Sequence, residues 1–514
     1  MTMSDHAEEE EVAHRLGGKS RREKRVSFPP DEEMVSGYAE SKDARQDGDS
    51  RNLSDIISAY ERSCAKHKVA PDPRTLDQIK TPQVSQQNIT QSSTLPPQAH
   101  RLPFVHPGAI FSPGVRLDYR MCESLEEILK SVRFNLINLQ GAELEENGAS
   151  SLMDMISYYE SATHLDVSSN TDMGVSGWQA LSRLLIQSGC LWRLDACNIP
   201  IEDYPAQALS RALLSSRLTV LHLENTGLSG KPLFTLVIAL FVLAAPHAKI
   251  ISHFFLGVCS LKKNIALQEL YLCDNELNSF HDAMQLGELL KYKRTLRTLD
   301  LTNNAISDSG LEELCDGLRV QKSGLRTLVL HNNRITHRAM THLGSVLPLL
   351  RTLETLDLSD NDLQDRGMHV LKEALISNRS ITRLGLASVG ITCEGAVVLA
   401  EFLAESRFLQ MLDVSQNLIL TGGLMAFALA LKLNRTLAHL DLDRNPNEEE
   451  DEFLIETQKD LLSRISDLCA ANAEAASEMD RGSAALFNHD DCDGKDNSGE
   501  AVARRVPAQT LASA

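Results

Sequence analysis

The sequence predicts an α/β solenoid, in which short units of one strand and one helix are stacked along the chain. Two observations support this fold class. The 11-residue pattern L-x-x-L-x-L-x-x-N-x-L occurs six times between residues 267 and 419, and successive copies start 28 or 29 residues apart. Each copy is followed by apolar residues at helical spacing, as in GLEELCDGLRVQ (310–321). A fixed period of this length is typical of a repeat architecture.

These units are leucine-rich repeats. The L-x-L segment predicts a short strand whose leucines point inward, and weaker copies starting at 134, 162, 191, 218 and 437 extend the array over residues 115–447. Stacked repeats bury one another's apolar edges, so we expect a horseshoe with strands on its concave side. Its repeat length and full helices resemble the ribonuclease-inhibitor subclass. Five asparagines are expected to bond neighbouring backbone at the turn that leaves the strand: Asn275, Asn304, Asn333, Asn361 and Asn417.

Two places depart from this rhythm. One interval of 49 residues contains an insertion at about 241–261, which is more apolar than a surface loop and which we interpret as a splice variant or gene-model error, rather than a functional loop. We expect a poorly ordered bulge there. A further repeat should start near Pro107, but PGAIFSPGVRL lacks the leucines. The sequence therefore predicts that this first strand is degenerate or missing.

The segments outside the repeats are predicted from composition. We expect a disordered arm over 1–50, a short amphipathic helix over 51–68, a Pro/Gln/Ser/Thr-rich linker over 69–114, a C-terminal capping helix over 448–471 and a disordered tail over 472–514.

The composition and the motifs of the chain argue against several classes of function. A net charge of −19 argues against nucleic-acid binding. Ten scattered cysteines without a CxxC pair predict reduced thiols in an intracellular protein, cytoplasmic or nuclear. The longest apolar run, within 232–261, is too short to cross a membrane. We expect no cofactor and no metal, because the calcium-loop-like segment 489–500 starts with His489 and lacks flanking amphipathic helices. The sequence contains no catalytic motif, so we expect a non-enzymatic protein.

One short motif points to a protein partner. Val26 and Phe28 lie between a basic run and an acidic run, in a stretch with no other sign of folding. The segment resembles the R-V-x-F docking motif of protein phosphatase 1 regulators, in which the valine and the phenylalanine fill two apolar pockets while the backbone pairs with a sheet edge. Many of these regulators add a second apolar pair downstream, as in this chain. The docking residues that this resemblance implies are Lys24, Arg25, Val26, Phe28, Met34 and Val35.

The repeats and the motif together extend the resemblance. Stretches such as VLHLENTGLSGKPL and LDLDRNP, in order with R-V-S-F, resemble leucine-rich repeat regulators described as inhibitors of the phosphatase. This resemblance implies binding to the protein phosphatase 1 catalytic subunit and its inhibition. Ser27 follows basic residues inside the motif, and we hypothesise that phosphate there blocks docking by adding negative charge to an apolar strand. A tolerated small residue is the alternative.

A second clue is an acidic stripe. Aspartate occupies the outward strand position between the central leucines in six repeats: Asp166, Asp195, Asp300, Asp357, Asp413 and Asp441. The stripe could hold a second, basic protein, or L-D-L could simply be common in this subclass and stay solvated.

Two other functions of the whole protein remain open. A GTPase-activating repeat protein would have an acidic C-terminal extension, which AVARRVPAQTLASA does not supply, and an exposed arginine in the early repeats. A plain scaffold would make the Val-x-Phe pair accidental.

Overall fold

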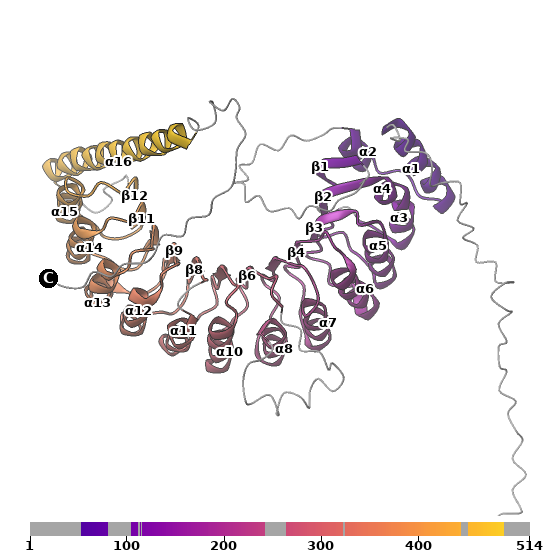
Figure 1. The fold of residues 1–514 in the computed structure, drawn as a ribbon, viewed down its shortest axis with the longest axis horizontal. Coiled ribbons are helices and arrows are strands. Elements are labelled where there is room, and N and C mark those ends of the chain that lie inside the picture. The colour runs from indigo at the N-terminus through magenta and orange to yellow at the C-terminus, as the bar shows by residue number, and fades with distance from the viewer. Residues whose placement is uncertain are drawn as a thin grey trace, which may run out of the picture. The chain divides into compact units, whose positions relative to one another are not determined.

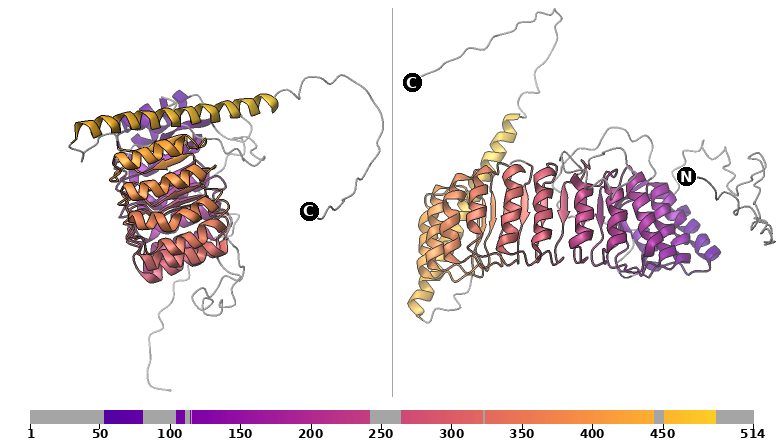
Figure 2. Two further views of the ribbon diagram at one scale, coloured as in Figure 1. Left: turned by 90° about the vertical axis from the view of Figure 1, so that its left-hand side faces the viewer. Right: turned by 90° about the horizontal axis from the view of Figure 1, so that it is seen from below.

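The computed structural model describes residues 53–80, 104–110, 114, 116–241, 264–321, 324–443 and 451–487. The chain divides into residues 1–50, which lie outside these ranges, and residues 51–514. In the second unit, strands line the concave side of a repeat array and helices cover its convex side, as Figures 1 and 2 show. This is the leucine-rich repeat solenoid that the sequence predicts.

The strands of the described residues form one parallel sheet, in which each strand pairs with the next along the chain. They are β1 (Phe104–Ile110), β2 (Val132–Asn138), β3 (Ala162–Asp166), β4 (Arg193–Asp195), β5 (Val220–His222), β6 (Glu269–Tyr271), β7 (Thr298–Asp300), β8 (Thr327–Val329), β9 (Thr355–Asp357), β10 (Arg383–Gly385), β11 (Met411–Asp413) and β12 (His439–Asp441).

The helices on the convex side follow the strands in order. They are α3 (Tyr119–Ser124) and α4 (Glu126–Ser131), then α5 (Glu146–Tyr159), α6 (Gly174–Gln187), α7 (Asp203–Leu213), α8 (Gly230–Phe241), α10 (Phe280–Tyr292), α11 (Asp308–Gln321), α12 (Met340–Val346), α13 (Gln364–Ser377), α14 (Cys393–Glu405) and α15 (Thr421–Leu431). Helix α12 ends in the short 3₁₀ turn η2 (Leu347–Leu349). Among the described helices, none is long and apolar enough to span a lipid bilayer.

Leucines and asparagines hold the repeats together. The strand leucines Leu270 and Leu272 are completely buried, as are their counterparts in neighbouring repeats. Asn304 is also buried, and its Nδ2 donates to the carbonyl oxygen of Leu272 in the preceding repeat at 2.8 Å. Its Oδ1 accepts from the backbone N–H of Asn275 at 2.9 Å. The other four predicted asparagines likewise bond backbone atoms, which confirms their predicted role.

The first strand is present but irregular, so of the two predicted alternatives, a degenerate or a missing strand, the structure shows the degenerate one. Strand β1 pairs with β2, and the register shifts between His106 and Ala109. Pro107 and Gly108 lie in that shift, opposite the single residue Asn135. Proline has no N–H for the ladder, and a bulge on an edge strand accommodates it. The linker prediction for 69–114 is therefore wrong over β1.

Two helices precede this strand. Helix α1 (Leu53–His67) lies where the sequence predicts a short helix, and it packs against α3 and α4 through buried Ile56, Tyr60 and Cys64. Helix α2 (Pro73–Lys80) falls inside the predicted linker, so that prediction is wrong over α2 too. Its start is fixed by Asp72, whose carboxylate accepts from the N–H and hydroxyl of Thr75 at 3.0 and 2.7 Å. The pair covers the apolar end of the array beside the first repeats.

The ladder continues across the predicted insertion. Val220 on β5 is paired with Glu269 on β6, and helices α8 and α10 are in contact. Residues 242–263, which hold almost all of the predicted insertion, lie outside the described residues. The two repeats that flank the segment thus stack on each other directly.

The C-terminal helix α16 (Glu452–Phe487) is longer than predicted. It buries Leu461, Ile465 and Cys469 against the last repeat, as a capping helix does. It continues beyond residue 471 to Phe487, so the prediction of a disordered tail from residue 472 is wrong over this stretch. The sequence ANAEAASE is rich in alanine, the residue with the highest helix propensity, which favours this continuation.

Candidate protein-binding surface

The concave face presents side chains in rows. Because the strands pair in register, residues at one repeat position lie side by side across the sheet. The residue between the two central leucines forms one such row: Asp166, Asp195, His222, Tyr271, Asp300, Val329, Asp357, Gly385, Asp413 and Asp441. The structure therefore brings the six predicted aspartates into one row, although four other residues interrupt it.

Most of these aspartates support the turn that follows their strand. The Oδ1 atoms of Asp166 and Asp357 accept from the backbone N–H two residues later at 2.9 Å. Asp300 and Asp413 accept in the same way at 3.0 Å, and also from the hydroxyl of the same residue at 2.7 Å. This is the local bonding typical of aspartate in turns. These four side chains remain partly exposed on the concave face.

Asp195 has different surroundings. Only 7% of the residue is exposed, and its carboxylate contacts Nε2 of His164 at 2.6 Å and Nε of Arg193 at 3.0 Å. Burial alone would raise the pKa of Asp195, but the hydrogen bonds from His164 and Arg193 outweigh it and hold the pKa below its ordinary value. Asp195 is thus a buried carboxylate held in its charged form by side chains from β3 and β4.

The network extends onto two more strands. Nδ1 of His222 lies 3.8 Å from Asp195, and its ring stacks on Tyr271 with centroids 4.0 Å apart. The Tyr271 hydroxyl donates to Glu269 at 3.0 Å, and burial raises the pKa of Tyr271 above its ordinary value. We call the set His164, Arg193, Asp195, His222 and Tyr271 the Asp195 patch. It is a preorganised polar and aromatic surface on strands β3 to β6.

Sequence reasoning missed this patch because it treated Asp195 as one of six equivalent residues. The sequence does contain a sign of the patch, two residues before the aspartate position. His164 and Arg193 occupy that position in β3 and β4, whereas threonine occupies it in β7, β8 and β9. Aligning whole repeats as columns would have placed a histidine and an arginine beside Asp195.

Two of the described cysteines are deeply buried in the repeat core. Burial raises the pKa of both Cys122 and Cys315 to about 12, so these thiols stay protonated and unreactive. All the described cysteines are free thiols. Within the described residues, no group of three or more potential ligands is placed to hold a metal ion.

The docking motif at residues 24–35, with Ser27 inside it, lies outside the residues that the structure describes. The docking residues and the phosphorylation site therefore stay predictions from the sequence.

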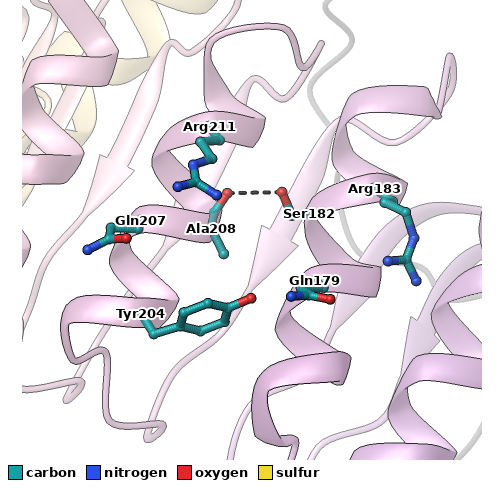
Figure 3. Close-up of a pocket in the computed structure, with 7 residues that line it drawn as sticks. All are labelled: Gln179, Ser182, Arg183, Tyr204, Gln207, Ala208 and Arg211. Carbon is teal, nitrogen blue, oxygen red and sulfur yellow. Dashed lines mark hydrogen bonds between the residues drawn. The ribbon is translucent and has the colours of Figure 1, made fainter. Parts of the chain in front are cut away.

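A polar pocket lies on the convex side, between helices α6 and α7 (Figure 3). Its volume is about 230 Å³. The lining side chains come from one stripe of each helix: Gln179, Ser182 and Arg183 on α6, and Tyr204, Gln207, Ala208 and Arg211 on α7. None of the lining residues is acidic.

The fold defines this chain as a leucine-rich repeat protein. Residues 292–315 and 350–371 match the family model described as "Leucine Rich repeat". The chain is similar to a curated protein of Bos taurus named "Protein phosphatase 1 regulatory subunit 37", with 45% identity over 332 residues. That match covers 64% of this chain and 42% of the cattle protein.

More distant animals have similar proteins. The protein of the same name from Danio rerio is 44% identical over 331 residues, which are 64% of this chain and 32% of that protein. A Caenorhabditis elegans protein named as its homolog is 33% identical over 334 residues, 63% of this chain and 31% of that protein. The matches span less than half the length of these relatives.

Proposed function

We propose that this chain is a regulatory, inhibitory subunit of protein phosphatase 1. The observation that carries the proposal is the R-V-S-F segment at 25–28, in a chain whose curated relatives are named as regulatory subunits of that phosphatase. The repeat array supports it as a protein-binding scaffold rather than an enzyme. We place its action inside the cell, in the cytoplasm or the nucleus, where free thiols are stable.

In the proposed docking mode, Val26 and Phe28 fill two apolar pockets of the phosphatase. Pro29 and Pro30 would favour an extended path after Phe28, as pairing with a sheet edge requires. Lys24 and Arg25 add charge on one side, and Met34 with Val35 adds an apolar contact on the other. Phosphate on Ser27 would place nearly two negative charges between the two anchors and prevent docking.

The concave face is the proposed second contact. The partly exposed carboxylates of Asp300, Asp357 and Asp413 accept bonds from the turn through Oδ1, and a basic partner would approach them from the solvent side. The Asp195 patch next to them adds aromatic, histidine and arginine side chains, and tyrosine and arginine are enriched at binding hot spots. The horseshoe would then orient the bound phosphatase or recruit another protein to it.

Capture of the purified phosphatase catalytic subunit tests the docking proposal. The full chain with Val26→Ala and Phe28→Ala should retain at most about a tenth of wild-type capture, since two anchor residues are lost. The matched control is Val12→Ala with Leu16→Ala, which removes two apolar residues from the same arm and should leave capture unchanged. A peptide of residues 20–40 phosphorylated at Ser27 should compete far more weakly than the plain peptide.

Two results would count against the proposal. Undiminished capture by the Val26/Phe28 variant would refute docking through this motif. Full phosphatase activity in a saturated complex, measured on a phosphorylated protein substrate, would refute inhibition while leaving docking intact.

A further inference from the structure

Helices α6 and α7 carry the same five residues. Q-A-L-S-R occurs at 179–183 and again at 207–211, one repeat later. The two serines lie in equivalent contacts: Ser182 donates to the carbonyl oxygen of Ala208 at 3.0 Å, and the Ser210 hydroxyl lies 2.9 Å from that of Thr235 and 2.6 Å from that of Ala206 in its own helix. The contacts with Ala208 and Thr235 each tie a helix to the next one, so the two copies hold equivalent positions in the array.

The two arginines of these copies have different partners. Arg183 binds the Asp154 carboxylate of the preceding helix α5 through two nitrogens, with Nη2 at 3.0 Å from both oxygens. The corresponding neighbour of Arg211 on its preceding helix is Arg183 itself, 28 residues earlier. Among the described residues, no carboxylate lies within 4.0 Å of the Arg211 nitrogens. Asp154 thus pairs with the first of two successive arginines, and the second, Arg211, has no such partner among the described residues.

The pocket in front of Arg211 is rich in hydrogen-bond donors. Besides the two guanidinium groups it has the amides of Gln179 and Gln207 and the hydroxyl of Tyr204, which extends from α7 toward α6 (Figure 3). These groups come from both walls and none is acidic, although the chain as a whole carries a net charge of −19. Arg183 and Ser182 are bound to Asp154 and to Ala208, and the Arg183 and Gln207 side chains extend away from the gap between the two helices (Figure 3). Arg211, Tyr204 and Gln179 are the donors left for a ligand, and positive charge beside polar donors fits an oxyanion.

We propose that this pocket binds the phosphate of a phosphorylated serine or threonine on a partner protein. Asp154 shows what an arginine at this position binds, namely two oxygens of one anionic group. A phosphate monoester offers three oxygens and up to two charges, so it can accept from Arg211, from Tyr204 and from Gln179 on the α6 wall at once, where a carboxylate has only two oxygens. The proposal uses none of the residues of the R-V-S-F segment, and it does not depend on phosphatase docking.

Calorimetric titration of the full chain at low ionic strength tests the site. The probe is the peptide Ala-Ala-pSer-Ala-Ala, and the reference ligands are the unphosphorylated peptide, Ala-Ala-Glu-Ala-Ala and inorganic phosphate. Arg211→Gln should weaken binding of the phosphopeptide by about tenfold or more, because a charge-assisted bond is lost. Tyr204→Phe should weaken it by about threefold, since one neutral hydrogen bond is removed.

Gln207→Glu is the decisive variant. It places a carboxylate one helical turn before Arg211, where the two residues can pair along α7, so it should abolish binding without loss of thermal stability. Arg366→Gln on α13 is the matched control for charge, because that arginine is exposed and far from the pocket along the array. This control should bind like the wild type.

Three results would overturn the proposal. The first is a wild-type chain that does not bind the phosphopeptide, and the second is an Arg211→Gln variant that binds it normally. The third is equal affinity for inorganic phosphate and the phosphopeptide, which would assign the pocket to the free ion rather than to a protein partner. Capture of the phosphatase by any of these variants is a separate measurement, so failure of the phosphate site leaves the docking proposal standing.

Discussion

Asp195 in β4 and Asp300 in β7 occupy the same position of their repeats, yet their carboxylates have different hydrogen-bond partners. Asp300 accepts from the N–H and hydroxyl of Thr302, inside its own turn. The Asp195 carboxylate instead contacts the side chains of His164 on β3 and Arg193 on β4, and it is almost completely buried. In a solenoid, the role of a residue is thus set by its neighbours in adjacent repeats as much as by its own repeat.

The concave face accordingly divides into two regions. On β3 to β6, the Asp195 patch links histidine, arginine and aromatic side chains across the repeats. On β7 to β11, threonine and serine accompany the aspartates, and each carboxylate supports its own turn. We expect the first region to respond to mutation as a network and the second as a series of independent sites.

The largest expected effect is that of Asp195→Ala. It leaves His164 and Arg193 without their acceptor in a poorly hydrated place, and we expect the free energy of unfolding to fall by about 3 kcal/mol. Urea denaturation of the full chain measures this loss. Asp195→Asn keeps an oxygen acceptor and should cost less than half as much.

The pH dependence provides a check on the same residue. The pKa of Asp195 is lower in the folded chain than in the unfolded chain, so its stabilisation is present above the ordinary aspartate pKa. It is lost as the pH falls through the lowered value. The difference between wild type and Asp195→Asn should therefore shrink in acid; a difference that does not change with pH would mean that the charge of Asp195 is unimportant.

The sequence predicted the array well because the 28-residue period sets the strand register, and the register alone places the six aspartates in one row. It could not predict the burial of Asp195, because that depends on which side chains stand beside it in the next repeats. Pro107 and Gly108 made the β1 sequence look unlike a strand. A local sequence pattern does not show that this segment is an edge strand, where a bulge is tolerated. The two Q-A-L-S-R copies are visible in the sequence. Predicting the pocket at Arg211 also required knowing that α6 and α7 lie side by side.

Lys293 gives the opposite case, a buried charge that pairs with no carboxylate of the described residues. Only 3% of it is exposed, and its Nζ donates to the backbone oxygen and to Oδ1 of Asn264. Asn378 and Asn434 occupy this position in other repeats, where their amides bond backbone oxygens. Burial lowers the pKa of Lys293 to about 8, so the folded chain binds its proton less tightly than the unfolded chain does.

The sign of the pH effect follows from this shift. The unfolded chain holds more protons between the two pKa values, so stability should rise by about 2 kcal/mol from pH 7 to pH 10. Lys293→Met removes the titrating group and should lack this part of the rise when both chains are measured by urea denaturation. Parallel pH profiles for the two chains would show that Lys293 stays fully charged in the folded state.

The smallest expected effect belongs to the turn aspartates. Asp300→Ala and Asp413→Ala each remove an acceptor from one N–H and one hydroxyl in a partly exposed turn, and each should cost about 1 kcal/mol. The double variant should cost the sum, because the two turns lie four repeats apart and share no partner. Asp300→Asn keeps the acceptor and removes the charge, so it should be nearly neutral in the same measurement. If Asp300→Ala instead cost as much as Asp195→Ala, the turn bonds would be as important as the buried network. The division of the concave face into two regions would then be wrong.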